Sequence, residues 1–424
     1  MKALKAFKDF LVKSEKYYPA SNLDEVSDII NSKRFWLYAE SLGEFRLALY
    51  IIDIIKSILS EKKDPDPIFF ISFKTFSTLS LAQTSFKENK DATGGRILYF
   101  FHPFLGLGTI FKKYVSIIKP NYFISVQHPV SKKLIKELLN TALGKKLIFT
   151  GISAAGLKKM GVKVNLPEGG FSLSAVISRS FGADAVKINA MPMSLKYISC
   201  FGKDDADGVN VGGVSESKGK YFHNDIVISF VSVHKKESAF ILKFLKEIVS
   251  DENMRQNFNL KFIFVPRNIK NSRRLFESSS KIGLNPLYYG GNTGRINECA
   301  GNKALIVDKY GALDEIYPLS DIVYVGKSLF KNEKGGHNVL EPASYGKAII
   351  TGSYAVNFKD IIQEMLKYSA VTEVTEKNFK EVLTRLITNE ALRRETGQNG
   401  LNFCLKKRDE FKTYFKNYLT EIIA

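Results

Sequence analysis

Short apolar runs alternate with longer segments of helical periodicity along most of the chain, and polar or glycine-bearing loops separate them. Such runs are typical of strands buried on both faces of a parallel sheet, and the intervening segments are typical of crossover helices. The runs that fit this pattern best cover residues 35–39, 68–73, 97–101, 122–126, 226–233, 262–265, 304–307, 322–325 and 348–350. The pattern therefore predicts an α/β protein with doubly wound sheets.

Residues 203–220 interrupt this alternation with the segment KDDADGVNVGGVSESKGK, which is rich in Gly, Ser and Asp and has no periodicity. We interpret it as a linker between an N-terminal domain (1–202) and a C-terminal domain (221–400). A lysine-rich amphipathic segment (401–424) predicts a final helix. Ligands of doubly wound sheets bind at the carboxyl ends of the strands, so we expect a site in a cleft between two Rossmann-like domains.

The stretch that follows the predicted strand 322–325 carries the clearest candidate chemistry. Gly335 and Gly336 stand directly before a predicted helix at 339–345, and Asn338 can accept a hydrogen bond from its first turn. Pro342 fits this helix only in the first turn, and Gly346 is placed to end it in a left-handed conformation. A helix N-terminus flanked by glycines predicts capture of an anion such as a phosphate.

His337 and Glu341 lie one helical turn apart, so their side chains can share a face. The Glu341 carboxylate could then accept hydrogen bonds from ribose hydroxyls. The alternative is an ordinary strand–helix turn in which both residues serve as local caps. A metal site is disfavoured because no third ligand has suitable spacing, and Asp205 and Asp207 follow no apolar strand.

The stretch GGHNVLEPASYGKAIITGSYAVNF (335–358) resembles the nucleotide-sugar signature of the bacterial 3-deoxy-D-manno-octulosonic acid (Kdo) transferases. These enzymes add Kdo from CMP-Kdo to the lipid A precursor. The resemblance implies a GT-B type fold and inverting, metal-independent transfer, with CMP-Kdo as the donor substrate and no further cofactor. It implies donor binding by Arg267, Gly311, Lys327, Gly335, Gly336, His337, Asn338, Glu341, Ser353 and Asn357.

The run Ser-Leu-Gly-Glu that ends at Glu44 follows the predicted strand 35–39 and precedes a predicted helix at 45–59. One interpretation is a capping box in which Glu44 pairs with Ser41. The resemblance implies instead that Glu44 is the catalytic base, which takes a proton from the acceptor hydroxyl. The resemblance also places Ser41, Lys74 and Thr75 on the acceptor side.

Several positions depart from the family pattern. Asn268 stands where the family has histidine, Ala312 where it has an acidic residue, and Lys327 where it has a second glycine. The segment that begins at Gln127 lacks the family's carboxylates. These departures leave open a divergent transferase that uses another nucleotide sugar or acceptor.

The chain has 62 Lys and Arg residues and 43 Asp and Glu residues, which gives a formal net charge of +19. This excess of positive charge favours anionic partners. A basic amphipathic segment (1–18) could lie on an anionic membrane or dock on its own domain. A non-catalytic membrane- or nucleic-acid-binding protein is the lowest-ranked rival, and we expect no nucleic acid because no aromatic-interleaved basic motif is present. Three distant cysteines, no secretory signal and no long apolar stretch predict a cytoplasmic protein. The resemblance implies that it is peripheral on the inner face of the cytoplasmic membrane.

Overall fold

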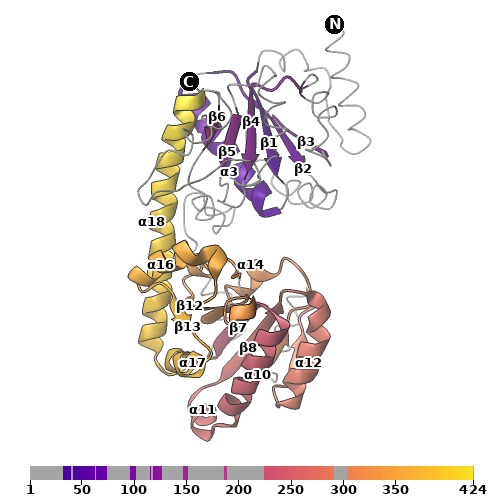
Figure 1. Cartoon of the computed structure of the whole chain (residues 1–424), viewed down its shortest axis with the longest axis vertical. Coiled ribbons are helices and arrows are strands. Elements are labelled where there is room, and N and C mark those ends of the chain that lie inside the picture. The colour runs from indigo at the N-terminus through magenta and orange to yellow at the C-terminus, as the bar shows by residue number, and fades with distance from the viewer. Residues whose placement is uncertain are drawn as a thin grey trace. The chain divides into compact units, whose positions relative to one another are not determined.

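The structure is a computed structural model of the 424-residue chain. It describes residues 32–39, 42–62, 64–73, 96–101, 115, 118–126, 147–150, 186–188, 224–290, 303–333 and 335–423. The chain divides into two compact units, one made of Met1–Ser199 with Glu410–Ala424 and the other of Cys200–Asp409 (Figure 1). The N-terminal helix and the linker expected at 203–220 lie outside the described residues.

The first unit is built on a parallel sheet in the order β3-β2-β1-β4-β5-β6. Its described elements are β1 (Arg34–Ala39), α3 (Leu42–Glu61), β2 (Ile68–Phe73), β3 (Arg96–Phe101), β4 (Tyr122–Val126), β5 (Leu147–Thr150) and β6 (Val186–Ile188). The chain proceeds outward from β1 to β3 and then returns to the other side of β1 for β4. The strand order therefore reverses between β1 and β4, which is the kind of switch point where doubly wound sheets bind ligands.

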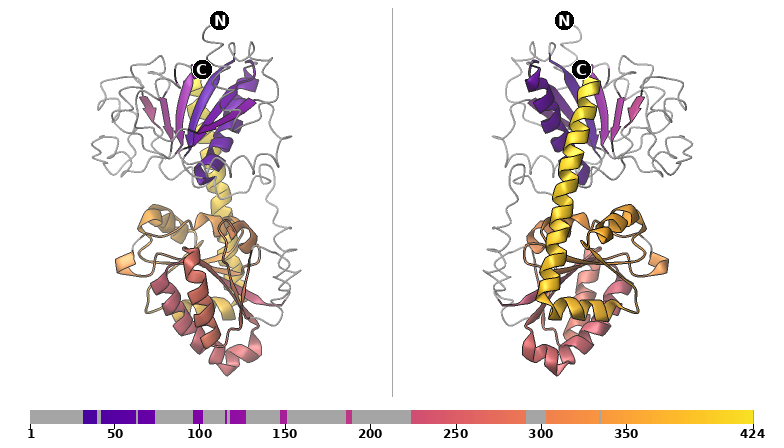
Figure 2. Two further views of the ribbon diagram at one scale, coloured as in Figure 1. Left: turned by 90° about the vertical axis from the view of Figure 1, so that its right-hand side faces the viewer. Right: turned by 90° about the vertical axis from the view of Figure 1, so that its left-hand side faces the viewer.

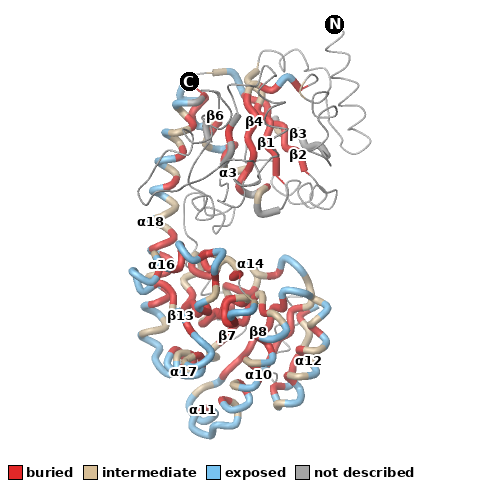
Figure 3. The backbone as a smooth tube through the Cα atoms, viewed as in Figure 1, coloured by how far each residue is buried: buried red, intermediate tan, exposed pale blue. Residues whose placement is uncertain are grey.

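The three central strands, β1, β2 and β4, are buried along almost their whole length, as the predicted strand pattern requires (Figure 3). Ile51 and Ile55 of α3 pack in one cluster with Phe35 and Leu37 of β1. The helix begins at Leu42, three residues before the predicted start. Residues 42–44 were expected to be a loop because of Gly43, but glycine is tolerated at a helix start and a carboxylate is favoured there by the helix dipole.

The second unit holds a parallel sheet in the order β13-β12-β11-β7-β8-β10-β9. Its strands are β7 (Ile226–Val233), β8 (Leu260–Pro266), β9 (Pro286–Tyr288), β10 (Ala304–Ile306), β11 (Ile322–Val325), β12 (Ala348–Gly352) and β13 (Thr372–Val374). The strand order reverses between β7 and β11. This junction is the switch point of the second sheet.

Helices flank the second sheet in both views of Figure 2. They are α10 (Lys235–Ser250), α11 (Glu252–Asn257), α12 (Ser272–Lys281), α14 (Leu313–Ile316), α15 (Leu340–Ser344), α16 (Lys359–Lys367), α17 (Phe379–Thr388) and α18 (Glu390–Ile423), with short 3₁₀ turns η4 (Ile269–Asn271), η6 (Lys331–Glu333) and η7 (Val356–Phe358). Ile228 and Phe230 of β7 share a core cluster with Ile241 and Leu245 of α10.

Helices of the second unit also differ in length from their predicted ranges. α10 starts at Lys235 instead of 238, because a buried glutamate at its third position accepts a hydrogen bond from the backbone before the helix. α14 stops at Ile316, short of the predicted end at 319, because Pro318 has no N–H to continue the helical ladder. The next N–H groups bond only three residues back, Leu319 to the carbonyl of Ile316 (3.1 Å) and Ser320 to that of Tyr317 (3.1 Å).

The last helix, α18, starts at Glu390 and not at Leu401. It passes through Gly397, whose position allows the helix to approach a neighbouring turn closely. A Cβ atom on Gly397 would lie 2.2 Å from the carbonyl oxygen of Gly346. Gly397 is therefore needed for packing within the second unit.

Candidate functional site

The candidate site lies at the carboxyl ends of β7 and β11, on either side of the switch point of the second sheet. His234 follows β7 and caps α10, while Gly326 follows β11. β7 and β11 are adjacent parallel strands, paired from Ile228 and Ile322 onward. Their carboxyl ends therefore lie at the same edge of the sheet. The segments that follow β7, β11 and β12 are therefore close enough to form one site.

A fully buried carboxylate, Glu237, holds the loop after β11. It accepts hydrogen bonds from five groups: the backbone N–H of Lys327 (2.7 Å), Ser328 (2.9 Å), Leu329 (3.3 Å) and His234 (3.2 Å), and the hydroxyl of Tyr324 (2.8 Å). Burial, with the nearby Glu237 charge second, raises the pKa of Tyr324 well above its usual value, so its hydroxyl stays a donor. A buried charge is tolerated here because hydrogen-bond donors surround it.

Gly326 makes this close arrangement possible. A Cβ atom on Gly326 would lie 2.8 Å from the carbonyl oxygen of Ser232 and 2.9 Å from Oε2 of Glu237. Any larger residue would separate the loop from the carboxylate that holds it. Lys327, the next residue, has a φ of +61°, a left-handed conformation that favours glycine. The position where the family pattern has a second glycine thus keeps a glycine-like backbone with a lysine side chain.

Two glycines join the loop after β11 to the loop after β12. The N–H of Gly336 donates to the carbonyl of Lys327 (2.6 Å), and the N–H of Asn357 donates to the carbonyl of Gly335 (2.7 Å). Gly336 has a φ of +81°, and a Cβ atom there would lie 2.7 Å from Cβ of Ala355. Only glycine therefore fits at 336.

Two histidines and two cationic side chains gather over these loops. The rings of His234 and His337 are stacked, with centroids 6.0 Å apart. Both Nε2 atoms are buried, and neither has a hydrogen-bond partner among the described residues. Arg267 follows β8, where its N–H donates to the carbonyl of Val233 (3.1 Å). The arrangement leaves imidazole nitrogens and positive charge available for an anionic ligand.

Burial lowers the pKa of His337 to about 4, and the positive charges of Arg267, His234 and Lys327 act in the same direction, in that order. The Glu237 carboxylate opposes them more weakly. At neutral pH His337 is therefore uncharged, and its imidazole can either donate or accept one hydrogen bond at Nε2.

Asn338 and Glu341 organise the start of α15. Oδ1 of Asn338 accepts from the N–H of Leu340 (3.1 Å), as the sequence predicted for a capping residue. Its Nδ2 donates to Oε1 of Glu341 (3.1 Å), and the Tyr317 hydroxyl donates to Oε2 (3.3 Å). The Glu341 carboxylate is thus fixed in orientation by Asn338 and Tyr317. Pro342 lies in the first turn, and Gly346 has the expected left-handed φ of +65°.

The other predicted donor residues lie farther along the same edge. Gly311 follows β10 with a φ of +79°, and it is exposed next to the buried Ala312. Ser353 and Asn357 are exposed in the segment after β12. Asn268 accepts from the N–H of Lys270 (3.0 Å) and so caps a turn.

Glu44 is half-buried in the first turn of α3, directly after β1 and at the switch point of the first sheet. Ser41, Lys74, Thr75 and Gln127 lie outside the described residues. The choice between capping and catalysis for Glu44 therefore stays open in the structure.

Sequence reasoning missed three residues of this site, namely His234, Glu237 and Tyr317. A signal for Glu237 was present, since a glutamate in the third position of a helix after an apolar run is the capping-box pattern. Nothing in the sequence indicated that Glu237 also binds Lys327, which lies 90 residues later in the chain. Tyr317 gave no signal because its role depends on packing between α14 and α15.

Metal ligands do not gather in the described part of the chain, where no three His, Cys, Asp or Glu side chains are close enough to hold an ion. Among the helices that the structure describes, none is both long and apolar enough to cross a bilayer.

Each of the two units is built on a doubly wound parallel α/β sheet with candidate residues at its switch point, as the sequence predicted. The 3-deoxy-D-manno-octulosonic acid transferase of Aquifex aeolicus is 34% identical over 155 residues, which cover 37% of this chain and 39% of that protein. The enzyme of the same name from Chlamydophila psittaci is 30% identical over 191 residues, 44% of this chain and 41% of the relative. The matched segment thus spans about two fifths of the length of these relatives.

A longer match joins the chain to the 3-deoxy-D-manno-octulosonic acid transferase of Rickettsia conorii, at 22% identity over 417 residues, 92% of this chain and 79% of that protein. The chain is therefore a relative of the Kdo transferases, and the resemblance predicted from the sequence is confirmed. No family model matches the chain.

Among solved structures, the C-terminal CMP-Kdo binding domain of WaaA from Acinetobacter baumannii aligns with a TM-score of 0.39 and 21% identity, over 46% of this chain and 97% of that domain. UDP-GlcNAc 2-epimerase from Neisseria meningitidis aligns with a TM-score of 0.46 and 12% identity, over 91% of this chain and all of that chain (100%).

Proposed function

We propose that the chain is an inverting, metal-independent glycosyltransferase that moves Kdo from CMP-Kdo to a lipid A precursor in lipopolysaccharide biosynthesis. The observation that carries this proposal is the stacked pair His234 and His337, whose buried Nε2 atoms lack partners in the described residues and lie among Arg267 and Lys327. The Kdo transferase relatives support the identity of the transferred sugar.

The donor would be held along the edge formed by β7, β8, β11 and β12. Arg267 and Lys327 would neutralise the phosphate, and the buried imidazoles would donate to its oxygens. Gly336 would let the backbone approach the ligand, while Glu341, already fixed by Asn338 and Tyr317, would accept from the ribose hydroxyls. Gly311, Gly335, Ser353 and Asn357 would complete the donor loops.

The leaving group of this reaction is CMP, and negative charge grows on its phosphate as the bond to the sugar breaks. Fixed cations near that phosphate stabilise the transition state more than the ground state. On the acceptor side, Glu44 would remove the proton from the attacking hydroxyl, with Ser41, Lys74 and Thr75 lining that side. Such a base contributes on the order of 10²–10⁴ in rate.

We further propose that the protein works in the cytoplasm at the inner face of the membrane, where the lipid A precursor is presented. The net charge of +19 supports this, because an anionic leaflet attracts clustered lysines and arginines.

A divergent transferase with another nucleotide sugar or acceptor is the second candidate. It is favoured by Ala312, which is buried and offers no carboxylate, and by Asn268, whose side-chain oxygen is used within its own turn. In that case the same cradle would bind the phosphate of a different nucleotide.

Single-turnover transfer from CMP-Kdo to a lipid A precursor tests the proposal, with wild type beside Glu44→Gln. We expect wild type to form product. We expect the rate of Glu44→Gln to be at least about a hundredfold lower, with CMP binding unchanged. Asp53→Asn, an exposed change on the same helix, is the matched control and should keep full activity. Transfer by Glu44→Gln at the wild-type rate would exclude Glu44 as the base. CMP binding without Kdo transfer by wild type would favour the divergent transferase.

A further inference from the structure

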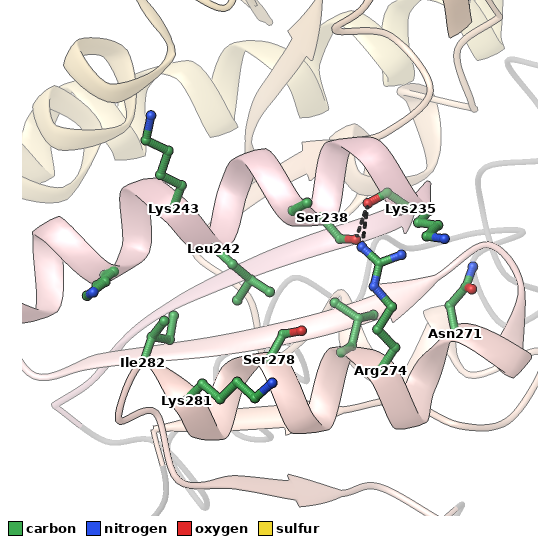
Figure 4. A pocket seen from close by; sticks show the side chains of 12 residues that line it. Lys235, Ser238, Leu242, Lys243, Asn271, Arg274, Ser278, Lys281 and Ile282 are labelled. Atoms are coloured by element: carbon green, nitrogen blue, oxygen red, sulfur yellow. Dashed lines mark hydrogen bonds between the residues drawn. The ribbon is translucent and has the colours of Figure 1, made fainter.

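A groove of about 290 Å³ runs between α10 and α12 of the second unit, and Lys235 at one end of it directly follows His234 of the nucleotide cradle (Figure 4). The two helices follow neighbouring strands, β7 and β8, so they lie side by side in the same direction. In Figure 4, Leu242, Ser278 and Ile282 lie between the helices, and Arg274 reaches from α12 to the first turn of α10.

The groove is lined by cations without any carboxylate. Its positive residues are Lys235, Lys243, Lys246, Arg274 and Lys281. Within the described ranges none of the five forms an ion pair. The carboxylates nearest in sequence are already occupied, since Glu247 pairs with Lys380 (2.6 Å) and Glu277 with Arg273 (2.9 Å). The positive charge of the groove is thus left for a ligand.

Arg274 gives the groove a directed donor. Its Nη2 contacts the carbonyl oxygen of Lys235 at a long 3.5 Å, and its buried Nη1 has no hydrogen-bond partner among the described residues. A guanidinium with free donors matches the oxygens of a phosphate in a bidentate geometry. Lys281 lies along the same side of the groove, whereas Lys243 points away from α12 in this view (Figure 4).

The floor of the groove is apolar, in contrast to its rim. Leu242 and Leu275 form the floor with Ala239 and Ile282. A free phosphate or a small polar anion would gain nothing from this floor, because only apolar surface is stabilised by covering it. An amphiphile would place its phosphate among the cations and its apolar part over the leucines.

We infer that the groove between α10 and α12 binds the phosphate of an anionic amphiphile at a bilayer surface. This deepens the membrane part of the proposed function by naming where the second unit meets the lipid. It requires no contribution from the donor cradle, which lies at the strand ends.

The test uses the full chain and flotation with vesicles of phosphatidylcholine and phosphatidylglycerol in a three-to-one ratio. The groove variant is Lys246→Glu, Arg274→Glu and Lys281→Glu combined. The matched control reverses three exposed cations elsewhere on the second unit, Lys367→Glu, Lys377→Glu and Arg385→Glu, so both variants have the same net charge. Calorimetric binding of CMP verifies that each variant is folded and keeps the donor site.

We expect the groove variant to lose about tenfold or more of its vesicle partitioning, and the control to lose much less. We also expect inorganic phosphate at millimolar concentration to leave partitioning of the wild type unchanged at fixed ionic strength.

Equal losses in the two variants would overturn the inference, since net charge alone would then explain binding. Retained partitioning in the groove variant would overturn it as well. Displacement by inorganic phosphate would show a site for free phosphate instead. If wild type does not bind CMP, the proposed donor site is contradicted, but the vesicle comparison between the two variants still tests the groove.

Discussion

Glu237 is the residue on which the loop after β11 depends. Its two oxygens accept from three consecutive backbone N–H groups, a tyrosine hydroxyl and the cap of α10. Replacing it leaves several buried donors with one acceptor fewer, and an unsatisfied buried donor is costly.

For Glu237→Gln we expect a loss of about 2–3 kcal/mol in the free energy of unfolding. The side chain becomes a neutral acceptor, and an NH₂ group replaces one carboxylate oxygen, so that it faces N–H and O–H groups that also need an acceptor. CMP affinity should fall together with stability. Glu247→Gln, exposed on the same helix, is the control and should leave stability nearly unchanged. Chemical denaturation of the two variants measures the difference, and similar curves would refute this role of Glu237.

His337 should couple anion binding to protons. Its pKa of about 4 in the free protein rises when a phosphate binds nearby, since negative charge favours the imidazolium. Binding of CMP therefore takes up a proton. As pH falls from about 7 to about 5, the CMP affinity of wild type should increase relative to the CMP affinity of His337→Gln. Calorimetry in buffers of different ionisation enthalpy measures the proton uptake. The same uptake in wild type and His337→Gln would exclude His337 as its source.

The low pKa also affects stability. The pKa of His337 is lower in the folded chain than its unfolded value of 6.5, so the unfolded chain takes up the proton first as pH falls. The contribution of His337 to stability is complete above about pH 6.5 and is lost as pH falls toward about 4. Wild type should therefore lose more stability over this range than His337→Gln.

At the scale of elements, the loops after β11 and β12 hold each other by backbone hydrogen bonds, so their glycines differ in importance. A Cβ atom on Gly336 would meet the backbone of Ala355, while one on Gly335 would meet only the end of the Lys327 side chain, 2.7 Å from its Cε. The Lys327 side chain can move, and the backbone cannot move without breaking the loop.

We expect Gly336→Ala to lower the free energy of unfolding by about 2 kcal/mol or more, since a left-handed φ and a steric conflict coincide there. Gly335→Ala should cost about 1 kcal/mol or less, because the lysine end can shift. Denaturation curves of the two alanine variants provide the comparison. Equal costs would mean that the loops are not held together as described.

The positions of the elements were largely predictable, and the reasons for their exact ends were not. The apolar runs 226–233 and 322–325 coincide with β7 and β11, because a strand buried on both faces is mostly apolar along its length. The early starts of α10 and α18 depend on the Glu237 bond and on the approach of Gly397 to Gly346, which are tertiary contacts. The glycine run 335–336 was visible in the sequence, whereas its neighbour His234 comes from a strand a hundred residues away.

At the scale of the whole molecule, the C-terminal helix contributes to both units. Leu401 and Cys404 are buried in the second unit, while Phe415 and Leu419 join the core cluster of the first. The stability of the first unit therefore depends on residues far from it in sequence.

Phe415→Ala should lower the stability of the first unit by about 3–5 kcal/mol, because it empties a fully buried aromatic position. Trp36, the one tryptophan of the chain, is buried in β1 and reports this unfolding by fluorescence. CMP binding in the second unit should persist under native conditions. Tyr414→Ala, which removes a side chain that is 44% exposed, is the control and should leave the transition nearly unchanged. A Trp36 transition that does not move in Phe415→Ala would refute this role of the helix.

The measurement that tests the account most directly is calorimetric titration of CMP into wild type, into a double variant Arg267→Ala and His337→Ala, and into Arg273→Ala as control. Arg273 is exposed on α12 and pairs with Glu277, away from the cradle. We expect the double variant to bind CMP at least about tenfold more weakly, since it loses a charge-assisted contact to phosphate and a buried partner, and the control to bind like wild type. The same affinity in all three proteins would contradict a nucleotide site at the ends of β7 and β11.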